Sequence, residues 1–120
     1  VTGEGGCGGA LAISVGDHLS MLEYATYSVA SPEACASIIW RSADEAEKAA
    51  ESMKVSASEL KKINIIDEII QEPLGGAHRN YDLTSEIIKK SLIKNLSSLQ
   101  KLSNEKLIER RYQRLLKIGK

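Results

Sequence analysis

Apolar residues recur with a helical period through the last third of the chain. From Tyr81 onward they lie three or four positions apart, opposite lysines and serines, which predicts one long amphipathic helix. A break at 102–104 precedes a second helical pattern. We therefore predict a long C-terminal helical hairpin over residues 81–120, with its apolar stripe in a core or an interface. The stripe comprises Leu83, Ile87, Ile88, Leu92, Ile93, Leu96 and Leu99.

The rest of the chain carries shorter apolar segments of two kinds. Residues 10–15 predict a short helix that is buried on all sides. Residues 18–23 alternate between apolar and polar side chains, as a strand does, and residues 24–29 continue in extended or loop form. The β-branched run at 65–70 predicts another strand, followed by a loop that includes residues 77–80. This mixture indicates a helix-rich α/β fold.

Three helix-start signals mark the middle of the chain. Ser31-Pro32-Glu33 combines a capping serine, a proline at the first helical position and an acid near the positive end of the helix dipole, so a helix should run to about Trp40. Ser42-Ala43-Asp44-Glu45 opens a second helix to about Met53. Ser56-Ala57-Ser58-Glu59 has the spacing of a capping box before a third, short helix. We predict that the second and third helices lie on the surface.

A glycine run precedes the first predicted helix. Five of the nine glycines lie in the first nine residues, in the segment Gly3-Glu4-Gly5-Gly6-Cys7-Gly8-Gly9. Because glycine has no Cβ, such a run lets backbone amides approach a ligand, and the helix start adds unpaired N–H groups and a positive dipole end. The segment therefore predicts an oxyanion hole formed by the peptide amides of Gly8 and Gly9. The alternative is a tight turn whose glycines serve only close packing.

The same run also matches a dinucleotide-binding pattern. Gly3-x-Gly5-x-x-Gly8 has the spacing of that fingerprint, and Glu23 could contact a ribose. A βαβ crossover, however, normally contains a full helix, whereas Gly16-Asp17 would end this one after about two turns. On this ground we predict that no dinucleotide binds here.

Few side chains suggest catalysis or ligand binding by themselves. Cys7 could be a nucleophile activated by the helix start, but the sequence places neither His18 nor His78 beside it as a base, so we expect a small buried residue. Arg79 and the cluster Arg110-Arg111-Tyr112-Gln113-Arg114 could hold a phosphate or a carboxylate. The alternative that we favour is a solvated or subunit-facing helix surface.

Composition argues against several classes of function. The 16 basic and 16 acidic residues balance and alternate along the second half, whereas nucleic-acid-binding proteins usually show a basic face. Cys7 and Cys35 lie far apart without ligand spacing, so we expect neither a disulfide framework nor a metal site, and a reducing compartment fits best. No apolar run is long enough to cross a membrane. We expect no nucleic-acid, metal or membrane partner for this chain.

Four sequence blocks together resemble one known family. They are similar to blocks of the alpha subunits of bacterial and plastid acetyl-CoA carboxylase carboxyltransferases, members of the crotonase-like (ClpP/crotonase) superfamily, and they occur in the same order. Two positions depart from the family pattern, because Cys7 stands where Ser is expected and Ala34 where Gly is usual. The blocks are Gly3–Ala12, Tyr27-Ser28-Val29 with Ser31-Pro32-Glu33, Glu72–Arg79 and Arg110–Leu115.

The resemblance implies the C-terminal part of a full alpha subunit, with residues 1–80 in the crotonase-like core and residues 81–120 as a helical extension. It implies a carboxyltransferase that moves the carboxyl group of carboxybiotin, held on the biotin carboxyl carrier protein, to acetyl-CoA, giving malonyl-CoA for fatty acid synthesis. A beta subunit would complete an assembly of two alpha and two beta subunits and would carry the zinc. Biotin carboxylase, with its ATP, would belong to the holoenzyme. The location would be the bacterial cytoplasm or the plastid stroma, and this fragment alone should be inactive and poorly stable.

The resemblance also assigns roles to the glycine run. By position, the amides of Gly8 and Gly9 would hold the ureido oxygen of carboxybiotin, and Gly5, Gly6 and Cys7 would line the substrate site. In the family account the biotin anion itself deprotonates the acetyl group, so no protein base would be needed. Two other interpretations stay open, namely another crotonase-like acyl-CoA enzyme and a non-catalytic helical interaction segment.

Overall fold

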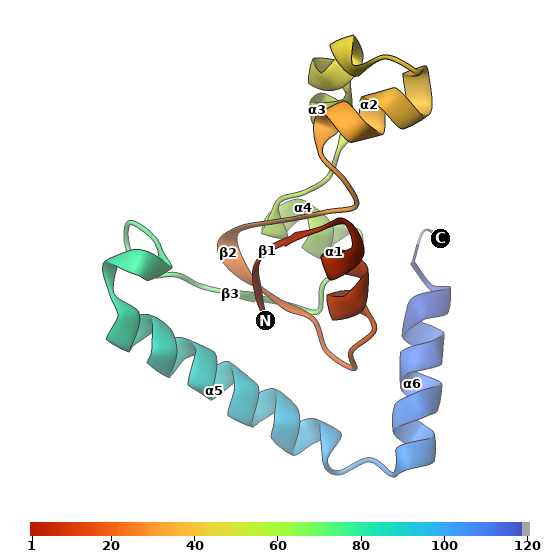
Figure 1. Cartoon of the computed structure of the whole chain (residues 1–120). Coiled ribbons are helices and arrows are strands. Elements are labelled where there is room, and N and C mark those ends of the chain that lie inside the picture. Colours follow the sequence, from red (N-terminus) through yellow and green to blue (C-terminus); the bar gives the residue numbers. More distant parts are fainter. Residues whose placement is uncertain (119–120) are drawn as a thin grey trace.

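The computed structural model describes residues 1–118 and has a small parallel sheet surrounded by helices (Figure 1). The strands are β1 (Thr2–Gly6), β2 (Ser20–Ser28) and β3 (Glu68–Ile70), in the order β1-β2-β3. The α-helices are α1 (Cys7–Ser14), α2 (Pro32–Trp40), α3 (Ala46–Ser52), α4 (Ala57–Lys62), α5 (Tyr81–Leu99) and α6 (Asn104–Leu116), with 3-10 turns η1 (Ala43–Glu45) and η2 (Ala77–Arg79). The predicted helix-rich α/β class is confirmed.

The first three elements form a βαβ unit. Strands β1 and β2 run parallel, with Gly5 opposite Tyr27 and Gly6 opposite Ser28, and residues 7–19 cross between them. Our ground for excluding a dinucleotide site is therefore wrong, because a helix of eight residues is enough to complete this crossover. The length of the crossover therefore does not exclude a dinucleotide site.

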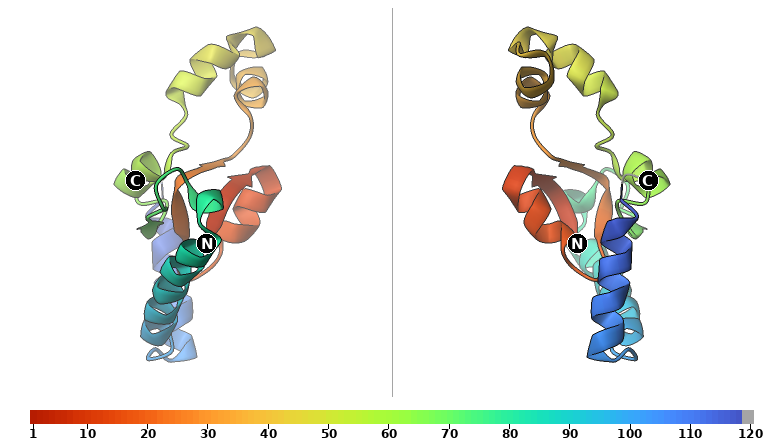
Figure 2. Two further views of the ribbon diagram at one scale, coloured as in Figure 1. Left: turned by 90° about the vertical axis from the view of Figure 1, so that its left-hand side faces the viewer. Right: turned by 90° about the vertical axis from the view of Figure 1, so that its right-hand side faces the viewer.

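The core lies where α1 and α4 cover the sheet. Figure 2 shows these two helices on opposite sides of it. Met21 in β2 is fully buried, and Leu19 and Ile66 are almost fully buried beside it. Helix α4 contributes Leu60 to this core and α1 contributes Ala10. The chain has no phenylalanine, and Tyr27 is the one aromatic side chain in this core cluster of the described residues.

Helices α2 and α3 form a separate small cluster away from the sheet (Figure 1). Ser31 caps α2 by accepting a hydrogen bond from the N–H of Ala34, at 3.2 Å, which confirms the predicted helix start. Ala34 lies inside regular helix, so the alanine at this position causes no backbone strain. The cluster packs Cys35 and Ala36 of α2 against Ala49 of α3.

Three local predictions need correction. Helix α1 begins at Cys7 instead of residue 10, and it is not buried on all sides, because only Ala10 is buried while Leu11 is 69% exposed. The strand predicted at 18–23 begins only at Ser20, while the extended form allowed for 24–29 is confirmed, since β2 continues to Ser28. Strand β3 occupies only the last part of the predicted run, because the N–H groups of Asp67 and Glu68 both donate to the carbonyl of Leu19 before regular pairing begins.

Helix α5 is attached to the sheet mainly through polar side chains. The carboxylate of Glu68 accepts hydrogen bonds from Ser91 at 2.6 Å and Asn95 at 2.7 Å on α5, and from Ser20 at 3.0 Å on β2. Burial alone would raise the pKa of Glu68, but these hydrogen bonds, with one from His18, outweigh it and lower the pKa to about 2. A carboxylate with this many donors stays ionised.

The apolar stripe of α5 is largely exposed within this chain. Leu92 and Leu96, for example, are 51% and 56% exposed. The stripe therefore does not form the core of the described residues, and its predicted burial in a core or an interface has to involve surface outside them.

The C-terminal helices do not form a packed hairpin in this structure. Helix α6 follows α5 after a short turn, but the two diverge from that turn (Figure 1). Helix α6 is instead held against the α1–β2 connection by arginines, as described below. No helix in the described part of the chain is long and apolar enough to cross a membrane.

Candidate functional site

The glycine run forms the junction between β1 and α1. Gly6 ends the strand in an extended conformation, with φ −143° and ψ 153°. Cys7 then turns the chain into the helix with a φ of 51°, in the left-handed region. That conformation costs a non-glycine residue about 1–2 kcal/mol. Strain of this kind is concentrated at functional sites, so this turn is the first candidate site.

The start of α1 is electrostatically uncompensated. Gly6 provides no side-chain cap, and the first turn contains no acidic residue. Gly6, Cys7, Gly8 and Gly9 are all exposed within this chain. The first N–H groups of a helix have no partner inside it and carry the positive end of the dipole. The turn therefore presents peptide N–H groups to any negatively charged oxygen that reaches it.

Packing does not explain why residues 8 and 9 are glycines. Apart from its chain neighbours and the nearby backbone of the helix itself, a Cβ placed on Gly8 or Gly9 would have no heavy atom of the described residues within 4 Å. Their backbones do not require glycine either, since among the described glycines a positive φ occurs only at Gly75 and Gly76. The open space beside these two amides is what the approach of a ligand requires.

Gly5 is different, because packing does require it. A Cβ at Gly5 would lie 2.6 Å from Cδ2 of Tyr27, which no real structure tolerates. The Tyr27 ring fills this space, and its hydroxyl donates a short hydrogen bond to the carbonyl of Ala10 in α1. Tyr27 thereby fixes α1 against β2. Sequence reasoning missed this role, although Tyr27 lies in one of the four family blocks.

Cys7 has no base beside it. The thiol is exposed, contrary to our expectation of a buried residue. His18 lies 3.3 Å from the carboxylate of Glu68, on the polar attachment of α5. His78 lies in η2, next to Gly76. In the described residues, therefore, nothing prepares Cys7 as a nucleophile.

Two residues that could have bound ligands have internal partners instead. Glu23 accepts a hydrogen bond from the N–H of Glu72 at 3.3 Å, so its carboxylate joins β2 to the loop after β3. Arg111 forms a two-pronged pair with Asp17, at 2.9 and 2.8 Å. The hydrogen bond from Arg111 holds the pKa of Asp17 below its usual range. Arg111 is thus held in an ion pair within the chain, which differs from the solvated or subunit-facing surface that we favoured for the arginine cluster. The Glu23 carboxylate is engaged in a hydrogen bond within the chain.

The block at 72–79 forms a tight loop beside β2. The carboxylate of Glu72 accepts hydrogen bonds from the N–H of Tyr24 at 2.8 Å and of Ala77 at 2.7 Å. Gly75 and Gly76 have φ values of 88° and 101°, which glycine alone adopts easily. The side chain of Arg79 packs beside Gly75. Sequence reasoning placed this loop but could not identify Glu72 as the residue that holds it.

The described residues hold no group of three or more His, Cys, Asp or Glu side chains that could bind a metal ion. Of the features found, the α1 start combines strain, exposed amides and glycines that packing does not require. It is the strongest candidate site.

Comparison with known proteins gives a consistent result. Residues 1–119 match the family model described as acetyl co-enzyme A carboxylase carboxyltransferase-like. The chain is 58% identical over 119 residues to the acetyl-coenzyme A carboxylase carboxyl transferase subunit alpha of Vibrio cholerae serotype O1, covering 99% of this chain and 37% of that protein. It is 59% identical to the subunit of the same name from Histophilus somni (strain 129Pt), covering 99% and 38%. The chain thus spans somewhat over a third of the length of these relatives.

Proposed function

Because the chain belongs to the acetyl co-enzyme A carboxylase carboxyltransferase-like family, we propose that it is part of the alpha subunit of an acetyl-CoA carboxylase. The proposed reaction transfers the carboxyl group of carboxybiotin to acetyl-CoA and forms malonyl-CoA for fatty acid synthesis. The support is an identity of 58–59% to named alpha subunits over nearly the whole chain. We place residues 1–80 in the crotonase-like core and residues 81–120 in a helical extension of it.

The start of α1 supplies the chemistry that this reaction needs. When carboxybiotin loses its carboxyl group, the N–C bond breaks and its electron pair spreads onto the ureido oxygen. The amides of Gly8 and Gly9 would donate hydrogen bonds to that oxygen as its charge grows. The observation that carries this assignment is the open space beside both glycines, which neither packing within residues 1–118 nor backbone conformation accounts for.

The neighbouring residues have supporting roles in this proposal. Gly6 and Cys7 line the approach to the amides, and both are exposed at the turn. Gly5 acts indirectly, because it makes room for the Tyr27 ring that holds α1 in place.

The proposed mechanism asks no side chain of this chain to act as a base. The biotin anion takes a proton from the methyl group of acetyl-CoA, and the resulting enolate attacks the released carbon dioxide to form malonyl-CoA. Protons and electron pairs balance without a further reactant. A site made of peptide amides, without a side-chain base, agrees with this mechanism.

The assembled enzyme would contain further components. We propose a beta subunit, in an assembly of two alpha and two beta subunits, that supplies the second oxyanion hole and the zinc. The biotin carboxyl carrier protein would bring carboxybiotin, and ATP-dependent biotin carboxylase would form it. The exposed Leu11, Ile38 and Leu92 would be covered by these partners or by the rest of the alpha subunit, because apolar surface of this kind is normally covered. The bacterial relatives favour the bacterial cytoplasm over the plastid stroma.

The test is the reverse reaction, malonyl-CoA-dependent carboxylation of a biotin derivative, catalysed by the full-length subunit with its beta partner. Gly9→Val fills the open space beside the amide, and we expect kcat/KM to fall about 100-fold or more, as for loss of an oxyanion-hole donor. Gly16→Ala is the matched control, because it lies at the other end of α1, where a Cβ makes only ordinary contacts.

Each outcome decides between the interpretations. Assembled Gly9→Val enzyme with full activity would make the glycine turn merely structural. A correctly assembled parent that does not use biotin would instead favour another crotonase-like acyl-CoA enzyme or a non-catalytic interaction segment. Size-exclusion chromatography confirms assembly in every case.

A further inference from the structure

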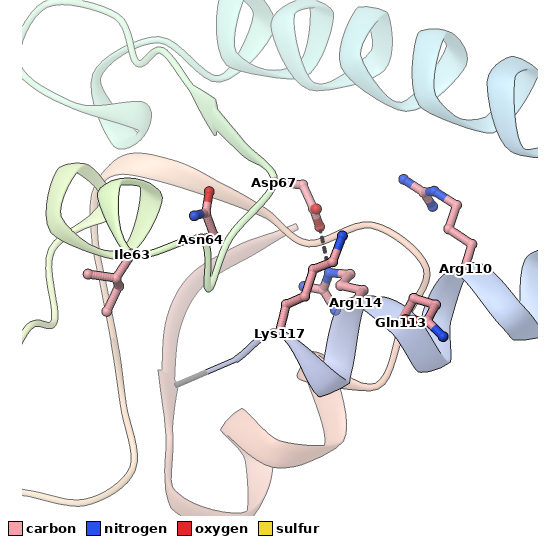
Figure 3. A pocket seen from close by; sticks show the side chains of 7 residues that line it. All are labelled: Ile63, Asn64, Asp67, Arg110, Gln113, Arg114 and Lys117. Carbon is pink, nitrogen blue, oxygen red and sulfur yellow. Dashed lines mark ion pairs between the residues drawn. The ribbon is translucent and has the colours of Figure 1, made fainter. Parts of the chain in front are cut away.

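A second concave region lies on the other side of the molecule from the α1 start. It is a pocket of about 670 Å³ between the end of α4, the segment before β3 and one face of α6 (Figure 3). This volume falls within the range of small-molecule sites. The residues that line it are Ile63, Asn64, Asp67, Arg110, Gln113, Arg114 and Lys117.

One acidic and one basic side chain in the pocket form an ion pair. Nε of Arg114 lies 3.2 Å from Oδ2 of Asp67, and the same carboxylate oxygen accepts a hydrogen bond from the N–H of Leu19 at 2.7 Å. The other nitrogens of Arg114 donate to backbone carbonyls, including those of Ser14 at 3.1 Å and Ile65 at 3.2 Å. Arg114 and Asp67 therefore form a fixed wall of the pocket, and as a pair they add little net charge to it.

Two further cations in the pocket are not neutralised in this way. Arg110 donates one hydrogen bond, from Nη1 to the carbonyl of Asp17 at 2.8 Å, and its charge also helps to lower the pKa of the Asp17 carboxylate, which Arg111 already pairs, so Arg110 is only partly neutralised. The ammonium group of Lys117 makes no ion pair within the same residues. Both side chains rise from the same side of α6 in Figure 3. Because the two residues are seven positions apart, their backbones lie about 10 Å apart along the helix.

We propose that this pocket binds a small phosphate-bearing anion with two anionic groups, held between Arg110 and Lys117. The fork of a guanidinium suits one phosphate group, and an ammonium acts as a point charge for the other. Two cations that face one cavity repel each other until an anion neutralises them. Because two separate cations line the pocket, an anion with two charged groups can neutralise both. The site is distinct from the proposed carboxybiotin site, so its ligand would be an effector or a second substrate group.

Calorimetric titration of the assembled enzyme with inorganic pyrophosphate, at constant ionic strength, tests this site. The pocket variant is Arg110→Gln/Lys117→Gln. The control variant is Lys101→Gln/Lys106→Gln, which removes the same charge near α6 but outside the pocket. We expect the parent and the control to bind pyrophosphate with one dissociation constant, and the pocket variant to bind at least tenfold more weakly. Inorganic phosphate should bind the parent more weakly than pyrophosphate.

Other outcomes would overturn the proposal. Absence of binding to the assembled parent would mean that the pocket is not a ligand site, and equal weakening in both variants would mean diffuse attraction to surface charge. If the double variant assembles poorly, the single substitution Lys117→Gln, at an exposed position, is titrated with pyrophosphate in its place. Because binding is measured without turnover, the result does not depend on whether the carboxyltransferase proposal holds.

Discussion

The helices of this chain begin in two different ways. A serine or asparagine side chain accepts a hydrogen bond from the N–H three residues later at the starts of α2, α4, α5 and α6, and Ser42 caps the turn η1 that leads into α3. Helix α1 begins at Gly6 with no side-chain cap, and α3 has none of its own either but continues directly from the capped turn η1. The capping residues of the four helices are Ser31, Ser56, Asn80 and Ser103.

This contrast separates helix starts that stabilise the fold from one that does not. A glycine at the N-cap in place of serine or asparagine costs a few tenths of a kcal/mol, and a glycine within a helix costs up to about 1 kcal/mol relative to alanine. In helix α1, Gly6, Gly8 and Gly9 each lower the stability in this way, and the left-handed backbone of Cys7 lowers it further. Local choices that oppose stability mark functional sites in otherwise consistent sequences. The difference therefore supports the ligand role that we propose for the α1 amides.

Adding a side-chain cap to α1 should have the largest effect, because it would make the start of α1 like those of the capped helices. Gly6→Asp introduces an acceptor at a position that is already extended and has open space for a Cβ. Its carboxylate should bond the amide of Gly8 or Gly9, the positions that a capping residue reaches. We expect unfolding to become a few tenths of a kcal/mol harder while kcat/KM for biotin carboxylation falls at least tenfold, measured by urea denaturation and by the reverse assay.

Gly6→Ala is the matched control, because it adds the same Cβ without an acceptor. It should keep most of the activity. If Gly6→Asp were as active as Gly6→Ala, the amides of the α1 start would not be needed in the reaction.

Loosening α1 should have a smaller effect. Tyr27→Phe keeps the ring against Gly5 but removes the hydroxyl that donates to Ala10. The loss of this hydrogen bond should destabilise the protein by about 1 kcal/mol. The helix start would then be held less firmly, so we expect kcat to fall by a factor of about two to five, measured in the same assay.

Tyr24→Phe provides the comparison, because Tyr24 is in the same strand and largely exposed. It should change neither stability nor turnover. Equal effects of the two substitutions would show that the Tyr27 hydroxyl has no particular role in positioning α1.

Sequence reasoning succeeded where the signal is local. The caps at Ser31 and Ser56 depend on residues two or three positions away, and both are confirmed. The long helix from Tyr81 was found because its period persists over many turns. The arginine cluster could be located but not interpreted, because Asp17, the partner of Arg111, lies 94 positions earlier in the chain.

The candidate site shows the same limit. The glycine run indicated amides near an anion, but sequence could not distinguish packing glycines from open ones. That distinction needs Tyr27, which lies far from Gly5 in sequence but against it in space. The exposure of Leu11 was missed for a related reason, since an apolar residue indicates burial without saying which surface buries it.

The smallest expected effect comes from removing a cap that serves the fold alone. Ser31→Ala deletes the acceptor for the N–H of Ala34 and should destabilise α2 by about 1 kcal/mol. Hydrogen exchange of the α2 amides should become faster, while carboxyl transfer stays unchanged, because α2 packs in a cluster separate from the core around α1. Ser37→Ala, in the middle of the same helix, should leave exchange unchanged. A fall in activity for Ser31→Ala would mean that the α2–α3 cluster also takes part in the reaction, and the two kinds of helix start would no longer be distinct.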